Sequence, residues 1–288
     1  MRQAGVVDSA RGLDPCSHVG WGYAGRTELR TRACEYLLDG VAAGQRIEFV
    51  GSGSVETLQA ELAGFADRDP NIGQGVVDRG AFRVALVDEV YAFSGAGRVV
   101  DPGRSISARI AATEDALAAG YTGLRAVVDA TALIGTVAQR VAYAHYEYLL
   151  DQQSSVLPLA TICAYDVAQL GRAAVAEIAC LHPLTSRGSS AFRLYTDDGA
   201  AFTLAGEIDF SSAGQLAETL GRVLPLMSGS ELVVDGRQLE FIDHRGLMAL
   251  DRCAGQGGVR LVLSTPRGTV AQIAEAIGLQ HLRVDVLR

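Results

Sequence analysis

Lysine is absent from this 288-residue chain, and all 25 of its basic residues are arginine. Lysine binds the phosphates in a Walker-type nucleotide site, forms Schiff bases with carbonyl substrates and serves some enzymes as a general base. These three kinds of site are therefore excluded, whatever the fold.

Other features are scarce as well. Aromatic residues make up 6% of the chain, so alanine, valine and leucine must fill most of the core. The formal net charge of −8 disfavours nucleic acid or an anionic membrane as the main partner, because both attract basic surfaces. No apolar run approaches membrane-spanning length, and residues 1–15 lack the apolar centre of a signal peptide. We therefore predict a cytoplasmic protein that does not enter a membrane.

The cysteines have no CxxC spacing, which disfavours a disulfide scaffold or a structural zinc site. We expect mostly reduced thiols that act as small core residues. The five cysteines are Cys16, Cys34, Cys163, Cys180 and Cys253.

Short apolar runs alternate with helical periodicity between residues 14 and 185, the predicted first domain. This alternation predicts an α/β fold with a mostly parallel sheet and helices on both faces. Residues 1–14 are polar and irregular, and we interpret them as a loose tail. The expected strands are 18–23, 46–50, 82–87, 124–129 and 157–166; the expected helices are 25–38, 55–65, 105–119, 134–152 and 167–181.

Polar or aromatic residues lie at the ends of several expected strands, and ligands of parallel sheets bind beyond the carboxyl ends of the strands. Singly, each such residue is better explained as a helix cap or a rim residue. The Gly51-Ser52 turn lacks the lysine of a phosphate-binding loop. Collectively these residues define the best candidate ligand pocket. They are Trp21, Tyr23, Gly51, Ser52, Asp129, Tyr165 and Asp166.

Metal binding and catalysis find no support in the residue spacing. His18 and His182 stand alone without metal-ligand spacing, so we expect structural roles for both and predict no metal site. No nucleophile–base pair can be argued in this domain. We predict no cofactor and no catalytic residue.

Several segments of the first domain carry a resemblance to a known family. They are His18–Tyr23 with Glu28-Leu29, Gly44–Val50, Gly120–Arg125, Tyr146-Glu147, Cys163–Asp166 and His182-Pro183. Together they resemble the MEDS domain, a sensory domain named for methanogens, methylotrophs and a dichloromethane-responsive regulator. The resemblance implies a degenerate RecA-like fold that senses small organic or hydrocarbon-derived molecules. It adds His18 and Glu147 to the candidate ligand-binding residues.

A Gly/Ser-rich stretch at residues 186–190 is the predicted linker to a second domain at residues 191–288. Asp243 ends one apolar run and begins a helical pattern, so we predict that it caps that helix. The expected strands are 192–195, 201–205, 231–235, 259–263 and 282–286, with a turn at 197–199; the expected helices are 213–226, 244–255 and 269–277.

Two motifs of the second domain, Gly206-Glu207-Ile208-Asp209 with Ser211-Ser212 and Phe241-Ile242-Asp243 with Gly246-Leu247, resemble the STAS domain of anti-sigma-factor antagonists. The resemblance implies a small sheet with helices on one side, and a surface that binds an anti-sigma factor or related kinase. The family's phosphorylatable serine is replaced by His244, and Arg245 follows it. Ser211 and Ser212 are better explained as helix N-cap residues than as a relocated switch. The implied docking residues are Asp209, Ser211, Ser212, Asp243, His244, Arg245 and Gly246.

Three functions remain open. The favoured hypothesis is a non-enzymatic signalling protein in which the first domain senses a small molecule and the second binds a protein partner. A second is a constitutive scaffold that has lost its switch, which the His244-Arg245 pair supports. The third is an enzyme that uses Asp129, Glu147 and Asp166 as acid–base groups.

Overall fold

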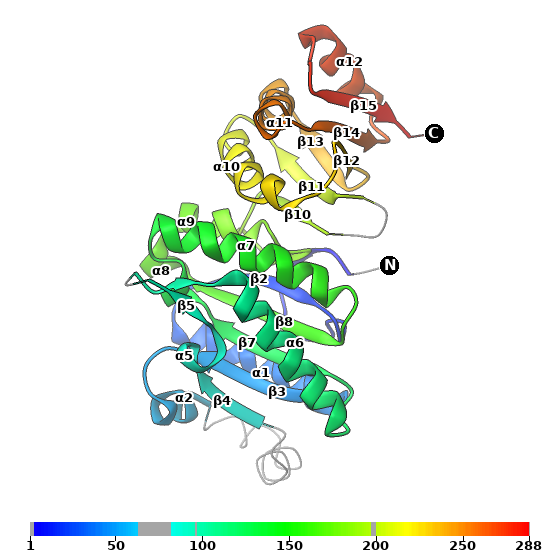
Figure 1. The fold of residues 1–288 in the computed structure, drawn as a ribbon. Coiled ribbons are helices and arrows are strands. Elements are labelled where there is room, and N and C mark those ends of the chain that lie inside the picture. The colour runs from blue at the N-terminus through cyan, green and yellow to red at the C-terminus, as the bar shows by residue number, and fades with distance from the viewer. Residues whose placement is uncertain (1–2, 63–81, 96, 197–199, 288) are drawn as a thin grey trace.

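Two α/β domains follow one another along the chain, the first blue to green and the second yellow-green to red in Figure 1. The structure is a computed structural model that describes residues 3–62, 82–95, 97–196 and 200–287. Within these ranges, no helix combines the length and the apolar character needed to cross a bilayer.

The first domain is built on a seven-stranded sheet in which every neighbouring pair of strands is parallel, as the sequence predicts. The strand order is β1-β9-β2-β8-β7-β3-β4. The strands are β1 (Gly5–Val7), β2 (His18–Tyr23), β3 (Arg46–Gly51), β4 (Phe82–Leu86), β7 (Leu124–Asp129), β8 (Leu159–Asp166) and β9 (Leu184–Ser186).

Helices cover both faces of this sheet (Figure 1). Strand side chains alternate between the faces: Cys163 and Tyr165 of β8 pack toward one core, and Ile162 and Ala164 pack toward the other. One face carries α1 (Arg26–Ala42) and α2 (Val55–Leu62); the other carries α6 (Pro102–Ala118), α7 (Val137–Ser154) and α9 (Arg172–Ala179). The short elements are α5 (Val87–Val90), β5 (Phe93–Ser94), β6 (Val99–Val100), η1 (Thr131–Leu133) and α8 (Val167–Leu170).

Two expectations about local structure are wrong, one for the N-terminal segment and one for the helix at 167–181. The N-terminal segment is not only a loose tail, because β1 pairs with β9 at the edge of the sheet. The linker at 186–190 stays a prediction; within it, β9 extends to Ser186, and the buried Ser189 hydroxyl accepts a hydrogen bond from the Gly22 N–H at 3.0 Å. The expected helix at 167–181 is divided into α8 and α9 at Gly171, whose φ of +79° lies outside the helical region. The expected turn at 197–199 lies outside the described residues.

The second domain has a mixed sheet of six strands with the path β10-β11-β12-β14-β15, and β13 pairs with the end of β11. Only the β10–β11 pair is antiparallel among the pairs described in this sheet. The strands are β10 (Phe192–Tyr195), β11 (Phe202–Ile208), β12 (Glu231–Asp235), β13 (Leu239–Ile242), β14 (Arg260–Thr265) and β15 (Leu282–Val286). The helices are α10 (Ala213–Val223), η2 (Leu224–Leu226), α11 (His244–Gly257) and α12 (Gly268–Ile277).

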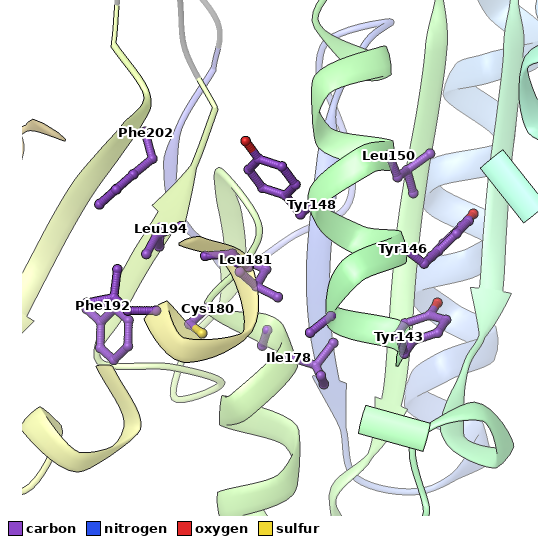
Figure 2. Packing of buried hydrophobic residues seen from close by; sticks show 14 of the residues in the cluster. Tyr143, Tyr146, Tyr148, Leu150, Ile178, Cys180, Leu181, Phe192, Leu194 and Phe202 are labelled. Atoms are coloured by element: carbon purple, nitrogen blue, oxygen red, sulfur yellow. The ribbon is translucent and has the colours of Figure 1, made fainter. Parts of the chain in front are cut away.

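The two domains share one continuous hydrophobic core (Figure 2). Phe192 and Leu194 of β10 belong to the same buried cluster as Ile178 and Leu181, which come from α9 and the turn after it. Polar contacts cross the same boundary, because Gln215 Nε2 donates to the Ala176 carbonyl at 2.7 Å and Arg222 Nη2 lies 2.9 Å from Glu177 Oε2. The domains are therefore joined by packing as well as by the chain.

We expect Phe192→Ala to lower the free energy of unfolding by about 3–5 kcal/mol, because it removes a fully buried ring from the shared core. The single tryptophan, Trp21, lies in the first domain, so its fluorescence in urea should report a lower midpoint although the substitution lies in the second. Phe210→Ala is the matched control, because Phe210 is 70% exposed. An unchanged Trp21 midpoint in Phe192→Ala would contradict the shared core.

Candidate functional site

A cleft lies at the carboxyl edge of the parallel sheet, where β2, β3, β7 and β8 end. Its volume is about 410 Å³. Two residues expected from the strand ends, Ser52 and Asp129, line it together. The lining residues are Arg26, Ser52, Glu61, Asp129, Thr131, Ala132, Gly135, Gln169 and Leu170.

Arg26 is the charged centre of this cleft, and sequence reasoning missed it. Its guanidinium forms ion pairs with both Asp129 and Glu61, and Nη1 donates to the Tyr23 hydroxyl at 3.3 Å. The Tyr23 hydroxyl in turn donates to Asp129 Oδ1 at 3.2 Å, and burial with the nearby Asp129 charge raises the pKa of Tyr23 to about 12. The position of Arg26 in the sequence could have revealed it, because Arg26 begins the helix that directly follows β2 and so lies at the carboxyl edge of the sheet.

Other expected pocket residues serve the fold around the cleft. A Cβ on Gly51 would lie 2.8 Å from a Leu58 methyl group, so this residue lets α2 pack closely on β3. Trp21 is buried in the core beside α1, where its Nε1 donates to Glu28 Oε1 at 3.4 Å. Asp166 caps α8 by accepting from the Ala168 N–H at 2.9 Å. It also accepts from the side chain of Gln169, a cleft residue.

A second polar site lies inside the core, and it consists of His18, Glu147, Cys163 and His182. All four are fully buried, and their candidate ligand atoms lie within 4.8 Å of one another. His18 Nε2 lies 3.0 Å from Glu147 Oε2, and the Cys163 thiol donates to the same oxygen at 3.6 Å. His182 Nε2 lies 3.4 Å from that oxygen. We call these residues the buried cluster.

The fold brings together two histidines that the sequence suggests are separate. His18 begins β2 and His182 follows α9, yet their ring centroids are 4.2 Å apart. Gly20 makes room for this approach, because a Cβ there would lie 2.9 Å from His182 Nδ1. The expectation that these histidines stand alone is therefore wrong, whereas their expected structural role stays a prediction. A separation of 164 residues along the chain leaves no local spacing signal.

The outer atoms of the buried cluster are held by hydrogen bonds. His18 Nδ1 donates to Asp151 Oδ1 at 3.0 Å, and His182 Nδ1 donates to the Ala179 carbonyl at 3.2 Å. The Tyr165 hydroxyl donates to Glu147 Oε1 at 3.0 Å. Asp151 was not predicted, although it lies one helical turn after Glu147 on α7.

Electrostatics inside the buried cluster favours a charged pair. Burial alone would lower the pKa of His18, but hydrogen bonds to Asp151 and Glu147 outweigh burial and raise it. Burial would raise the pKa of Glu147, yet the two neighbouring histidines lower it. Burial and the charge of His18 lower the pKa of His182, while burial and Glu147 raise that of the Cys163 thiol. The geometry agrees with these directions, because both ring nitrogens of His18 face carboxylate oxygens, one of Asp151 and one of Glu147.

In the second domain, two turns lie side by side because β11 pairs with β13. Asp243 is the N-cap of α11, as predicted, and accepts from the N–H groups of Arg245 at 2.9 Å and Gly246 at 3.0 Å. The neighbouring turn holds Asp209, which accepts from the Ser211 hydroxyl at 2.6 Å. The Asp243 N–H donates to the Ile208 carbonyl at 3.0 Å and joins the two turns.

The side chains of these turns differ in access. His244, Arg245 and Ser211 are exposed, whereas Ser212 is buried. Ser212 occupies the N-cap position of α10 but makes no side-chain capping bond, so the predicted capping role for it is wrong; Asp209 accepts from the local N–H groups instead. Gly246 is required for packing, since a Cβ there would lie 2.7 Å from Ile208 and Ile242.

Comparison with known families gives two matches. A family model described as the MEthanogen/methylotroph, DcmR Sensory domain (MEDS) matches residues 17–183. A model described as the Mlab, STAS domain matches residues 195–287. No curated protein matches the chain. Both matches agree with the resemblances carried by the sequence motifs, and the order of the two domains is the predicted one.

Gly20→Ala should lower the free energy of unfolding by about 1–3 kcal/mol, because the new methyl group would press on the His182 ring and the Ala179 backbone. Gly214→Ala is the control, since a Cβ on this α10 glycine meets nothing within 4 Å. The control should be neutral or stabilising by up to about 1 kcal/mol. Urea unfolding followed by Trp21 fluorescence measures both, and equal midpoints would contradict the tight approach at Gly20.

Proposed function

The chain belongs to the MEDS family of sensory domains and carries a STAS domain behind the sensory one, and we propose that it is a ligand-responsive signalling protein without enzymatic activity. Sensory domains serve signalling, and STAS domains interact with other proteins. The main support is the continuous core shared by the two domains. Through this core, a conformational change in the first domain could reach the second domain.

The cleft supports binding of a small organic molecule that carries a hydrogen-bond acceptor. The Arg26 guanidinium and the Ser52 and Thr131 hydroxyls supply donors around it. A ligand oxygen that binds Arg26 would compete with Glu61 of α2 for the same guanidinium. The resemblance points to hydrocarbon-derived molecules, and an oxygen-bearing derivative matches these donors.

The proposed partner surface of the second domain combines apolar and basic side chains. Phe210 is 70% exposed, and the Arg245 guanidinium lies 5.6 Å from the centre of its ring. Met248, one turn after His244 on α11, is also exposed. Aromatic and arginine side chains dominate the binding energy of many interfaces. We propose an anti-sigma factor or a related kinase as the partner.

Control by phosphate on the α11 turn is disfavoured, because His244 and Arg245 offer no hydroxyl group. In the adjoining turn, Ser211 is exposed and could be reached by a kinase, whereas Ser212 is buried.

A second candidate function follows from the lack of a hydroxyl group at residues 244 and 245. A STAS domain that binds its partner in every state would be a scaffold, and it would not need a ligand.

The three carboxylates considered as acid–base groups of an enzyme lie apart from one another, which supports a non-enzymatic role. Asp129 is paired with Arg26 in the cleft, Asp166 caps α8, and Glu147 is fully buried in the other site. They do not surround one common space. We also propose a cytoplasmic location, because cysteines scattered along the sequence without CxxC spacing are more typical of a reducing compartment than of a disulfide framework.

Arg26→Gln should weaken ligand binding about ten- to a hundredfold, which corresponds to the loss of a charge-assisted hydrogen bond of about 1.5–3 kcal/mol. Native mass spectrometry of the purified wild-type chain identifies the co-purifying molecule, and calorimetry then measures its affinity for each variant. Arg260→Gln, an exposed arginine on β14, is the control and should bind normally. Equal affinities of Arg26→Gln and wild type would place the ligand elsewhere.

Phe210→Ser should weaken partner binding by about 2 kcal/mol, or roughly thirtyfold, as expected for an aromatic residue at the centre of an interface. Val156→Ser is the matched control, because Val156 is 73% exposed on the first domain. The partner is captured with the wild-type chain, and its affinity is measured with and without the co-purifying molecule. Binding that never responds to that molecule would favour the scaffold and refute sensing.

A further inference from the structure

The buried cluster has the dimensions of a four-ligand metal centre. In tetrahedral zinc sites the metal–nitrogen bond is about 2.0–2.1 Å and the metal–sulfur bond about 2.3 Å, so neighbouring ligand atoms lie about 3.3–3.7 Å apart. Three of the observed separations are 3.0, 3.4 and 3.6 Å, all from Glu147 Oε2 to the other three side chains. The separation of Cys163 Sγ from His18 Nε2 is 4.0 Å. All four ligand atoms lie within 4.8 Å of one another, so an ion placed among them would draw the more distant ones closer.

One atom of the buried cluster lacks the partner that burial normally demands. His182 is fully buried, and its Nε2 makes no hydrogen bond of acceptable geometry, although Glu147 Oε2 lies 3.4 Å away. Because Nδ1 donates to the Ala179 carbonyl, the neutral ring directs the lone pair of Nε2 toward the cluster. Buried polar atoms without partners are rare and costly. A metal ion would use this lone pair.

Charge balance favours a divalent ion. A Cys163 thiolate and the Glu147 carboxylate contribute two negative charges, and two neutral imidazoles contribute none. A divalent cation would make the four-ligand centre neutral, which suits a site that is closed to water. Mixed nitrogen, sulfur and oxygen ligands at this spacing suit zinc and its first-row neighbours better than magnesium or calcium, which prefer oxygen.

The surroundings resemble the outer shell of known metal centres. Metal-bound histidines usually donate the other ring N–H to a carboxylate or a backbone carbonyl. His18 donates to Asp151, and His182 donates to the Ala179 carbonyl. Tyr165 holds the second oxygen of Glu147, which leaves Oε2 for the ion. These bonds orient all three ligands before any ion arrives.

We propose that His18, Glu147, Cys163 and His182 bind one divalent ion of the zinc class. With four protein ligands and no exposed edge, the centre is closed, so the ion has a structural or regulatory role and does not activate a substrate. Binding replaces the proton of the Cys163 thiol and the proton on His18 Nε2, and both protons leave to solvent. The centre differs from the cleft around Arg26 and needs neither a ligand nor a partner.

Asp151 connects this centre to the second domain. Its Oδ1 accepts from His18, and its Oδ2 accepts from the N–H and the hydroxyl of Thr196, both at 2.7 Å. Thr196 directly follows β10, the first strand of the STAS sheet. An ion that fixes the His18 ring therefore also fixes the carboxylate that holds the end of β10.

Metal analysis of the full-length chain tests the centre. After equilibration with Zn²⁺ and gel filtration, elemental mass spectrometry should find about one ion per chain. Co²⁺ in its place should give a thiolate-to-cobalt absorption band. Cys163→Ser should lose the band and most of the metal, whereas Cys180→Ser, at a buried cysteine outside the cluster, should keep both. Wild-type protein without bound metal, or a Cys163→Ser variant that binds as well as wild type, would overturn the proposal. If Cys163→Ser fails to fold, the thiolate-to-cobalt band of the wild-type protein tests the proposal instead: its presence supports the centre and its absence contradicts it.

The link through Asp151 has its own test. Asp151→Asn should weaken metal binding about ten- to a hundredfold, as expected for the loss of an outer-shell carboxylate. Asp115→Asn, at an exposed residue of α6, is the control and should bind normally. Hydrogen exchange at the amides of residues 192–196 should slow when the wild-type chain binds Zn²⁺. An unchanged exchange rate there would refute the connection to the STAS domain.

Discussion

Helix α7 is buried on two sides, and this double burial is the constraint on which the rest of the structure depends. Tyr143, Tyr146 and Leu150 point from α7 toward the parallel sheet, and Tyr148 points toward the second domain (Figure 2). A helix in this position must have apolar or satisfied residues almost all round. Its two buried carboxylates, Glu147 and Asp151, are each held by several hydrogen bonds.

Strand β2 distributes its side chains between two different sites. Alternation along the strand directs His18 and the two glycines that follow it to the α7 face, and it directs Trp21 and Tyr23 to the α1 face. His18 thus enters the buried cluster, and Tyr23 joins Arg26 and Asp129 at the cleft. The same strand therefore contributes residues to the buried cluster and to the cleft, and a shift of β2 would move side chains in both.

The surface that we propose for partner docking lies on two turns of the second domain that are held by hydrogen bonds and packing. Asp243 and Gly246 fix the start of α11 through a cap and a close packing contact. His244 and Arg245 follow this cap, at the position where the resemblance to anti-sigma-factor antagonists implies a phosphorylatable serine. We therefore propose that this turn is controlled from the first domain, through the shared core and the Asp151–Thr196 bonds.

The sequence by itself determined the local elements and the chemistry that is absent. Periodicity located most strands and helices, and the acid at the end of an apolar run identified the Asp243 cap. The lack of lysine excluded a Walker-type phosphate loop. Only the tertiary structure decided that β1 and β9 extend the sheet, that Arg26 reaches Asp129, and that His18 meets His182. The reason is physical: periodicity records which side of an element is buried, whereas the order of parallel strands, and so the meeting of residues far apart in the chain, follows from packing over the whole domain.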